Sequence, residues 1–174
     1  MAYFEGKYRP NPGRAKGNVR YIQHRPGKDG KHETRQLFDH TGAPISRDTA
    51  YEMIDNAEKK SMFWRFTISP DAKTEDTHRD LDMRALAQNT IAEIEEKLNK
   101  PIPWIAAVHT ETDNRHIHIL AIVNGYIPPP TLQAMRHTAT REALQQRQQL
   151  DLIREHEQRH QKRKEQQWER EQSR

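Results

Sequence analysis

The chain has 174 residues, of which 33% are hydrophobic and 31% charged, and a formal net charge of +4. This composition allows one compact domain with an appendage, but it is too polar for a single tightly packed globule, and the absence of cysteine excludes disulfide bonds, thiolate metal sites and cysteine catalysis. No apolar run approaches the roughly 18 residues of a membrane span, and the first residues lack the basic-then-apolar order of a signal peptide, so we expect a cytoplasmic protein of bacterial type.

The N-terminal region is basic and rich in Gly and Pro. Nine Lys and Arg residues lie between positions 7 and 35, with few acidic residues nearby. This pattern indicates either a loop-rich surface that binds phosphates or simply a solvated basic loop. Residues 18–23 fit one turn of helix as well as a short strand. Directly afterwards, a turn is predicted by Pro26, Gly27, Asp29 and Gly30.

A helix and a strand follow. Residues 46–60 predict a helix, because apolar residues recur at helical spacing after Ser46 and Asp48, either of which can cap it. Residues 62–69 are rich in aromatic and β-branched side chains and stop at Pro70, which predicts a strand.

The next elements are another helix and two more strands. Residues 80–99 carry the clearest helical stripe of the chain, and two prolines end it. Residues 104–110 and 116–123 predict two strands around a short polar turn.

Apolar residues are concentrated in the middle of the chain, between about residues 51 and 127. The sequence after residue 131 consists mostly of Gln, Arg, Glu and Lys, with a heptad pattern too weak to predict a coiled coil. We therefore expect a core domain over residues 1–130 and a charged helical tail over residues 131–174.

The last two strands predict a hairpin with a polar face. The Asp113–Asn114 pair tolerates positive φ, and when it forms the tip, Glu111 pairs with His116 and His109 with His118. Directly opposed residues share a face, so these four side chains project to one side. The other side is expected to face the core and carries Val108, Thr110, Ile117 and Ile119.

His109, His116 and His118 form a candidate metal site. Cross-strand Cβ atoms lie about 4.5–5.5 Å apart, so three imidazoles can converge on one ion at about 2.0–2.2 Å from each nitrogen. Three protein ligands leave positions open for substrate, as in a catalytic metal site. Glu111 is either a fourth ligand or, as we favour, a residue that orients an imidazole or helps to deprotonate a nucleophile. A polar strand face without a metal is the alternative.

Residues 109–119, His-Thr-Glu-Thr-Asp-Asn-Arg-His-Ile-His-Ile, resemble the third motif of conjugative and mobilisation relaxases of the MobA/VirD type, in the HUH endonuclease superfamily. Residues 19–22 are similar to the first motif of that family and residues 66–70 to the second. The resemblance covers about residues 15–127. It implies an α+β fold with a central antiparallel sheet and flanking helices, here followed by a C-terminal helical extension. Glu111 stands where the family usually has Asp.

The resemblance also implies a mechanism. Tyr21 would attack a phosphate of single-stranded DNA, giving a 5′-phosphotyrosine and a free 3′-hydroxyl, with Glu111 and the metal assisting its deprotonation. Tyr21 precedes the histidines, as the relaxase nucleophile does. His24 is the alternative nucleophile or proton carrier. Ser69 either holds a phosphate or merely ends a strand. Phosphate contacts are further expected, as a group, from Arg14, Lys16, Arg20 and Arg25.

The implied cofactor is a divalent ion, Mg²⁺ or Mn²⁺ first and Zn²⁺ as the alternative. The implied substrate is single-stranded DNA at an origin of transfer, nicked and rejoined in plasmid mobilisation. Implied partners are accessory relaxosome proteins and the coupling protein of a type IV secretion system, with no membrane contact. Two rival functions fit the same residues: a hydrolytic metal-dependent nuclease, and a nucleic-acid-binding scaffold with a structural metal site.

Overall fold

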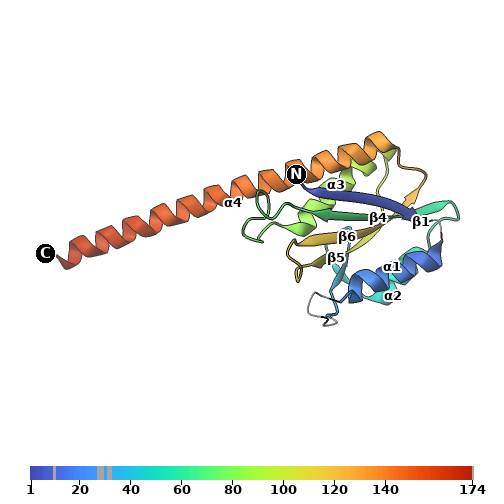
Figure 1. The fold of residues 1–174 in the computed structure, drawn as a ribbon, viewed down its shortest axis with the longest axis horizontal. Coiled ribbons are helices and arrows are strands. Elements are labelled where there is room, and N and C mark those ends of the chain that lie inside the picture. The colour runs from blue at the N-terminus through green and yellow to red at the C-terminus, as the bar shows by residue number, and fades with distance from the viewer. Residues whose placement is uncertain (10, 27–29, 31–32, 174) are drawn as a thin grey trace.

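The computed structural model of the protein describes residues 1–9, 11–26, 30 and 33–173 (Figure 1). Within these residues the chain forms six strands and four helices. The strands are β1 (Tyr3–Arg9), β2 (Leu37–Asp39), β3 (Pro44–Ile45), β4 (Ser61–Ser69), β5 (Trp104–His109) and β6 (His116–Asn124). The helices are α1 (Pro12–His24), α2 (Arg47–Asp55), α3 (Met83–Leu98) and α4 (Pro129–Gln172).

The strands form one antiparallel sheet in the order β1-β4-β6-β5-β2-β3. β4 and β6 make its longest pairing, and both are internal strands. This arrangement confirms the expected fold class, an α+β protein with a central antiparallel sheet, flanking helices and a long C-terminal helix.

Helices cover both faces of the sheet (Figure 1). Successive side chains of a strand point to opposite faces, so Trp64 and Phe66 of β4 pack with α3 and α4, whereas Phe63 packs with α1 and α2. Ala107, which lies opposite His118 in the β5–β6 pair, belongs to the α1–α2 side. The histidine face of the hairpin is therefore the face that α1 partly covers.

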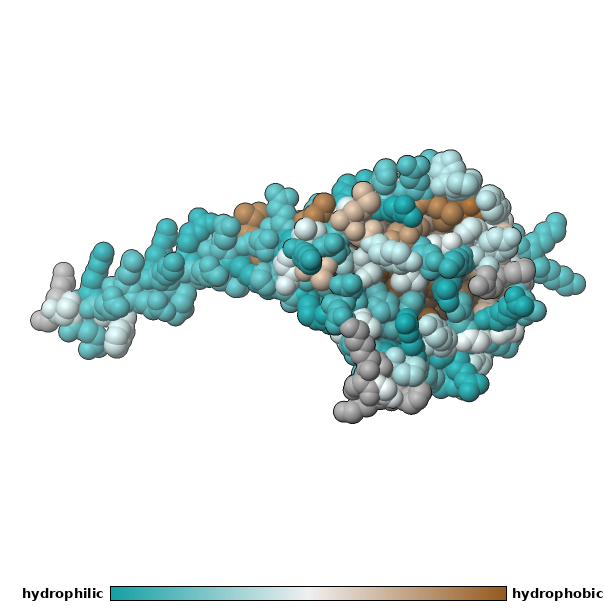
Figure 2. Space-filling model, viewed as in Figure 1, coloured by the Kyte–Doolittle hydropathy of each residue, from teal (hydrophilic) through white to brown (hydrophobic). Residues whose placement is uncertain are grey.

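Helix α4 has a packed half and a projecting half. Met135, Ala139 and Ala143 are fully buried in the core beside α3, and one turn further on Arg147 donates to the Asp80 carboxylate at 2.7 Å. After residue 154 every described residue is exposed, and the helix projects from the domain with an almost uniformly hydrophilic surface (Figures 1 and 2). Packing thus continues past the boundary expected at residue 130.

Capping residues set the ends of the helices. Residues 18–23 belong to α1, which settles the choice that the sequence left open in favour of helix. Helix α2 begins after Ser46 as expected but ends at Asp55, short of the predicted residue 60. Helix α3 begins only after Asp82, because that carboxylate accepts hydrogen bonds from the first free backbone N–H groups of the helix at 3.0 Å.

The sequence did not predict β1, β2 or β3. β1 lies in the segment expected to be loop-rich and pairs along its whole length with β4. The turn expected from Pro26 to Gly30 includes Gly27 and Asp29, which lie outside the described residues. Among the described helices, none is both long enough and apolar enough to cross a membrane.

Candidate metal centre

The histidine hairpin has a different register from the predicted one. His109 pairs with His116 and Ala107 with His118, so the expected pairing of His109 with His118 and of Glu111 with His116 is wrong by two residues. Residues 110–115 form a wider loop in place of a two-residue tip. A shift of two residues preserves the face to which each side chain points, because the side-chain period of a strand is two. The histidines therefore still share one face.

The wider loop is held by a segment that precedes α3. The Arg79 guanidinium donates hydrogen bonds to the carbonyl groups of Thr110, Thr112 and Asp113, so these groups turn away from the strand ladder. Thr110 consequently leaves the strand and is exposed, which corrects its expected place on the core face.

The three histidine side chains converge as predicted. Their ring centroids lie 4.7 to 4.8 Å apart, and one potential ligand atom of each lies within 4.8 Å of the others. His109 and His118 are 1% and 5% exposed, whereas His116 is half-buried. The cluster thus has one open side.

Each imidazole is held through one ring nitrogen. His109 Nε2 donates to the carbonyl oxygen of Ile22 at 2.7 Å, and His118 Nδ1 lies 2.9 Å from the hydroxyl oxygen of Thr67. His116 Nδ1 lies 3.1 Å from the carbonyl oxygen of Asn114. The second nitrogen of each ring is then left for a ligand. Hydrogen bonds of this kind fix the orientation of metal-bound histidines.

A buried atom without a partner supports a metal at this site. Among the described residues, His118 Nε2 is buried and has no hydrogen-bond partner. Buried polar atoms normally find a partner, so an unsatisfied imidazole nitrogen beside two other imidazoles fits a role as a metal ligand. The three histidines are suitable ligands for a divalent ion.

Burial also keeps the imidazoles neutral. Desolvation lowers the pKa of His109 to about 3, with a further contribution from the charge of Arg35. Desolvation, followed by the neighbouring histidines and the charges of Arg25 and Arg65, lowers the pKa of His118 to about 2. The neutral form is the one that binds metal ions, so protons do not compete for these ligands near pH 7.

Helix α1 brings Tyr21 to the open side of the cluster. Asn11 caps the helix, and Ala15, Val19 and Ile22 pack on the sheet, which leaves Tyr21 on the exposed side. The Tyr21 ring centroid lies 6.4 Å from that of His118. The next residue, Ile22, supplies the carbonyl that holds His109, so helix and metal site are joined directly.

Tyr21, His116 and His118 line one open pocket of about 590 Å³. The pocket brings together five of the predicted site residues: Tyr21, Arg25, Ser69, His116 and His118. His109 lies behind them as the buried ligand. The Arg25 guanidinium carbon lies 5.6 Å from the Tyr21 ring centroid, and the Ser69 hydroxyl donates to the carbonyl oxygen of Arg115 at 3.1 Å.

Glu111 lies elsewhere than the sequence predicted. Its carboxylate pairs with the buried guanidinium of Arg35 and accepts from the backbone N–H of Thr110 at 2.8 Å. Arg35 also donates to the carbonyl oxygen of Arg25 at 2.7 Å, at the end of α1. Glu111 therefore braces the end of the tyrosine helix through Arg35, in place of the expected contact with an imidazole.

The other predicted residues are spread over α1 and its surroundings. Lys16 pairs with Asp55 of α2 at 2.7 Å, while Arg14 and Arg20 are exposed outside the pocket lining. The His24 ring is bound by the Arg47 guanidinium at 2.7 Å and does not line the pocket.

Several residues of the pocket were not singled out from the sequence. Arg65 and Thr67 share a face with Ser69 on β4, so the alternation of strand residues was a usable signal for both. Tyr3 and Glu5 lie on β1, the strand that was missed, and no sequence signal pointed to them.

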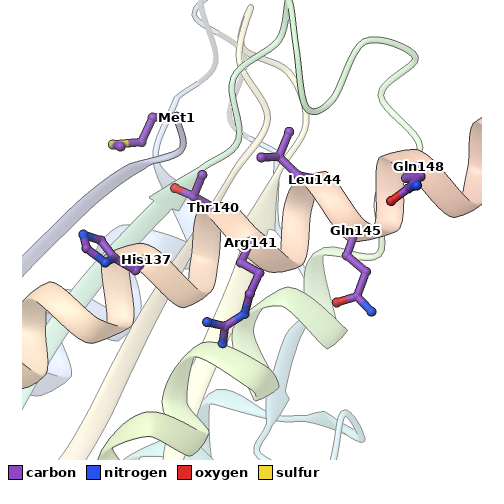
Figure 3. A pocket seen from close by; sticks show the side chains of 7 residues that line it. All are labelled: Met1, His137, Thr140, Arg141, Leu144, Gln145 and Gln148. Carbon is purple, nitrogen blue, oxygen red and sulfur yellow. The ribbon is translucent and has the colours of Figure 1, made fainter.

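A second hollow, of about 670 Å³, lies on the other side of the sheet between Met1 and α4 (Figure 3). Its lining is one face of α4 with a single histidine, His137, and no convergent group of ligands. The histidine pocket is therefore the candidate site.

Comparison with protein-family models and with curated protein sequences finds no significant match to this chain.

Proposed function

We propose that the protein is a relaxase-type endonuclease that nicks and rejoins single-stranded DNA at an origin of transfer. The observation that carries the proposal is the position of Tyr21, which faces the histidine cluster across one open pocket. A tyrosine beside a cluster of metal ligands supplies the nucleophile and the Lewis-acid site that metal-assisted phosphotyrosine chemistry uses.

In the proposed reaction the Tyr21 hydroxyl oxygen attacks a phosphorus atom of the DNA backbone. The Tyr21 Oη–P bond forms as the P–O3′ bond breaks, the phenolic proton is lost, and the leaving 3′ oxygen takes up a proton. The reverse reaction, in which the 3′-hydroxyl attacks the phosphotyrosine, rejoins the strand without any energy source, because the number of phosphoester bonds is conserved.

His109, His116 and His118 would hold a divalent ion, Mg²⁺ or Mn²⁺ by preference and Zn²⁺ as the alternative. When bound, the ion would polarise a non-bridging phosphate oxygen and stabilise the charge that develops there. Arg25 would contact the phosphate beside Tyr21, and Ser69 lines the same pocket from β4. We assign Glu111 a positioning role through Arg35, because its carboxylate is already paired there.

The test uses random-sequence single-stranded oligonucleotides, labelled at the 3′ end in one set and at the 5′ end in another. Each set is incubated with the protein and Mn²⁺ and run on a denaturing gel. A relaxase attaches the 3′-labelled fragments to the protein and shortens the 5′-labelled strands. Sequencing of the attached strands would identify the target.

The matched variants are Tyr21→Phe and Tyr126→Phe, since both tyrosines are exposed but only Tyr21 lines the pocket. We expect Tyr21→Phe to abolish the adduct and Tyr126→Phe to leave it unchanged. Cutting without any adduct, retained in Tyr21→Phe, would identify a hydrolytic nuclease. Binding without cutting, indifferent to chelation, would identify a scaffold. The proposed partners, accessory relaxosome proteins and a secretion-coupling protein, are expected only if the adduct forms.

A further inference from the structure

We infer that Arg65 and Arg25 form a two-guanidinium site for one phosphodiester phosphate beside the histidine cluster, and that Arg65 is a catalytic residue of the pocket. The proposed function supplies the identity of the anion, a phosphate of single-stranded DNA. The position of the two guanidinium groups stands independently of it.

Arg65 is fixed by the middle of the sheet. Its backbone pairs with Lys7 of β1 on one side and Leu120 of β6 on the other, so the strand cannot move without breaking both ladders. On the face of β4 that lines the pocket, Arg65 comes two residues before Thr67, the residue that holds His118. Arg25 reaches the same pocket from the end of α1. The two guanidinium groups therefore reach the pocket from different elements, Arg65 from β4 and Arg25 from the end of α1.

Among the described residues, the two buried arginines, Arg35 and Arg147, are paired with carboxylates. Arg35 pairs with Glu111, Arg147 with Asp80, and the mostly buried Arg115 binds Asp76 with two hydrogen bonds.

Arg65, which is half-buried, and Arg25, which is exposed, differ from this pattern. In the part of the chain that the structure describes, neither has a carboxylate partner; Arg65 makes one long hydrogen bond of 3.5 Å to Asn18, and Arg25 lies over the Tyr21 ring. Two carboxylates also line the pocket, Glu5 and Asp113, and Glu5 is paired with Lys7 at 2.5 Å. The two guanidinium groups thus face the pocket without an ion pair to a carboxylate of its lining.

Both arginines line the same pocket as His116 and His118. A divalent ion bound by the histidines would add further positive charge, and like charges held together are unfavourable unless an anion joins them. A phosphate fits best, because guanidinium groups bind its oxygens through two parallel hydrogen bonds.

Arg65 would then hold a non-bridging oxygen of the phosphate that Tyr21 attacks. Negative charge grows on these oxygens during phosphoryl transfer, and a fixed guanidinium stabilises it. Arg65 therefore contributes to the reaction rate as well as to binding, whereas a remote lysine or arginine contributes to binding alone.

The binding test separates Arg65 from general electrostatics. In Tyr21→Phe protein with Mn²⁺, the affinity for a labelled single-stranded oligonucleotide is measured by fluorescence anisotropy at several salt concentrations. Arg65→Met keeps the apolar stem and removes the charge; Arg159→Met removes the same charge from the projecting half of α4. We expect Arg65→Met to reduce the slope of log affinity against log salt by about 0.7, the value for one phosphate contact on a single strand. Arg65→Lys restores the slope and Arg159→Met leaves it unchanged.

Two further measurements complete the test. With Tyr21 present, Arg65→Met should slow single-turnover adduct formation at saturating DNA by at least about 10²-fold, with partial rescue by Arg65→Lys. The Mn²⁺ affinity, measured by calorimetry, should stay equal or rise, because a repelling charge is removed. A pocket that merely collapsed would lose Mn²⁺ affinity, and that result would overturn the inference.

The outcomes also distinguish the inference from the proposed function. A loss of slope specific to Arg65→Met, with no adduct formed by the parent protein, would leave the phosphate site standing and remove the relaxase function. If the parent protein forms the adduct, and Arg65→Met has the same salt slope and rate of adduct formation as Arg159→Met, the relaxase function would stand and the phosphate site would be refuted. A parent protein that does not bind single-stranded DNA at all would overturn both.

Discussion

Acid should destabilise the metal-free protein at a pH where carboxylates are still ionised. The buried imidazoles of His109 and His118 have pKa values of about 3 and about 2, far below the ordinary value of 6.5. Above pH 6.5 these rings are neutral in both the folded and the unfolded chain. Below pH 6.5 these rings are protonated in the unfolded chain but stay neutral in the folded chain, so the free energy of unfolding decreases as the pH falls.

The size of the effect follows from the two pKa values. Between pH 7 and pH 5.5 each of the two histidines should lower the free energy of unfolding by about 1.3 kcal/mol, or about 2.5 kcal/mol together. Burial also lowers the pKa of His116, which adds to this loss. A domain of ordinary stability, about 5–15 kcal/mol, would lose a large share of it.

Urea unfolding in EDTA at the two pH values measures the loss. In His118→Gln one titrating ring is missing, so the loss between the two pH values should shrink by about 1.3 kcal/mol. His160→Gln, which removes an exposed histidine from the projecting half of α4, should leave the loss unchanged. If His118→Gln loses as much stability on acidification as the parent protein, the buried neutral imidazole is not the cause and the reasoning is wrong.

Two further substitutions test the supports of the site. Asp76→Ala leaves the Arg115 guanidinium buried without its carboxylate, so we expect the free energy of unfolding to fall by about 3–5 kcal/mol in urea titrations. Thr67→Val keeps the branched shape but removes the hydroxyl at Nδ1 of His118, so we expect the Mn²⁺ affinity measured by calorimetry to fall about 10- to 100-fold.

Each of these substitutions has a matched control. Glu155→Ala breaks an exposed pair with Arg159 and should cost no more than about 0.5 kcal/mol. A similar cost for Asp76→Ala would mean that the buried pair does not hold the loop. Thr77→Val, at an exposed threonine outside the pocket, should leave Mn²⁺ binding unchanged. Equal Mn²⁺ affinities for Thr67→Val and Thr77→Val would show that Thr67 does not orient His118.

The sequence predicted the histidine face correctly although its register was wrong. Residues 109, 116 and 118 have the parity that places them on one side of a hairpin, and any even shift of the register keeps that parity. The pairing itself depended on Arg79 and Asp76, which lie in the segment before α3 and hold the hairpin loop from outside. A pattern read along two strands contains no information about a distant guanidinium.

The role of Glu111 shows the same limit. Glu111 is two residues from His109 and was therefore predicted on the polar face. In the structure it lies in the loop outside the strand, and its carboxylate is paired with Arg35. An ion pair between residues 76 positions apart in the sequence forms only when α1 and the hairpin have packed together. The strand β1 was missed for a related reason, since its mixture of Gly, Lys and Tyr becomes a strand only by pairing with β4.

By itself the sequence determined the elements and chemistry that depend on local pattern: the long helices, the strands at 62–69, 104–110 and 116–123, the shared face of His109, His116 and His118, and the absence of thiol chemistry. The tertiary structure alone decided which other side chains meet them. It brought Tyr21 and Arg25 from α1 and Arg65 and Thr67 from β4 to one pocket. It also placed Glu111 outside the pocket lining, paired with Arg35. The physical reason is that periodicity fixes where a side chain points within its own element, whereas its neighbours depend on how separate elements pack.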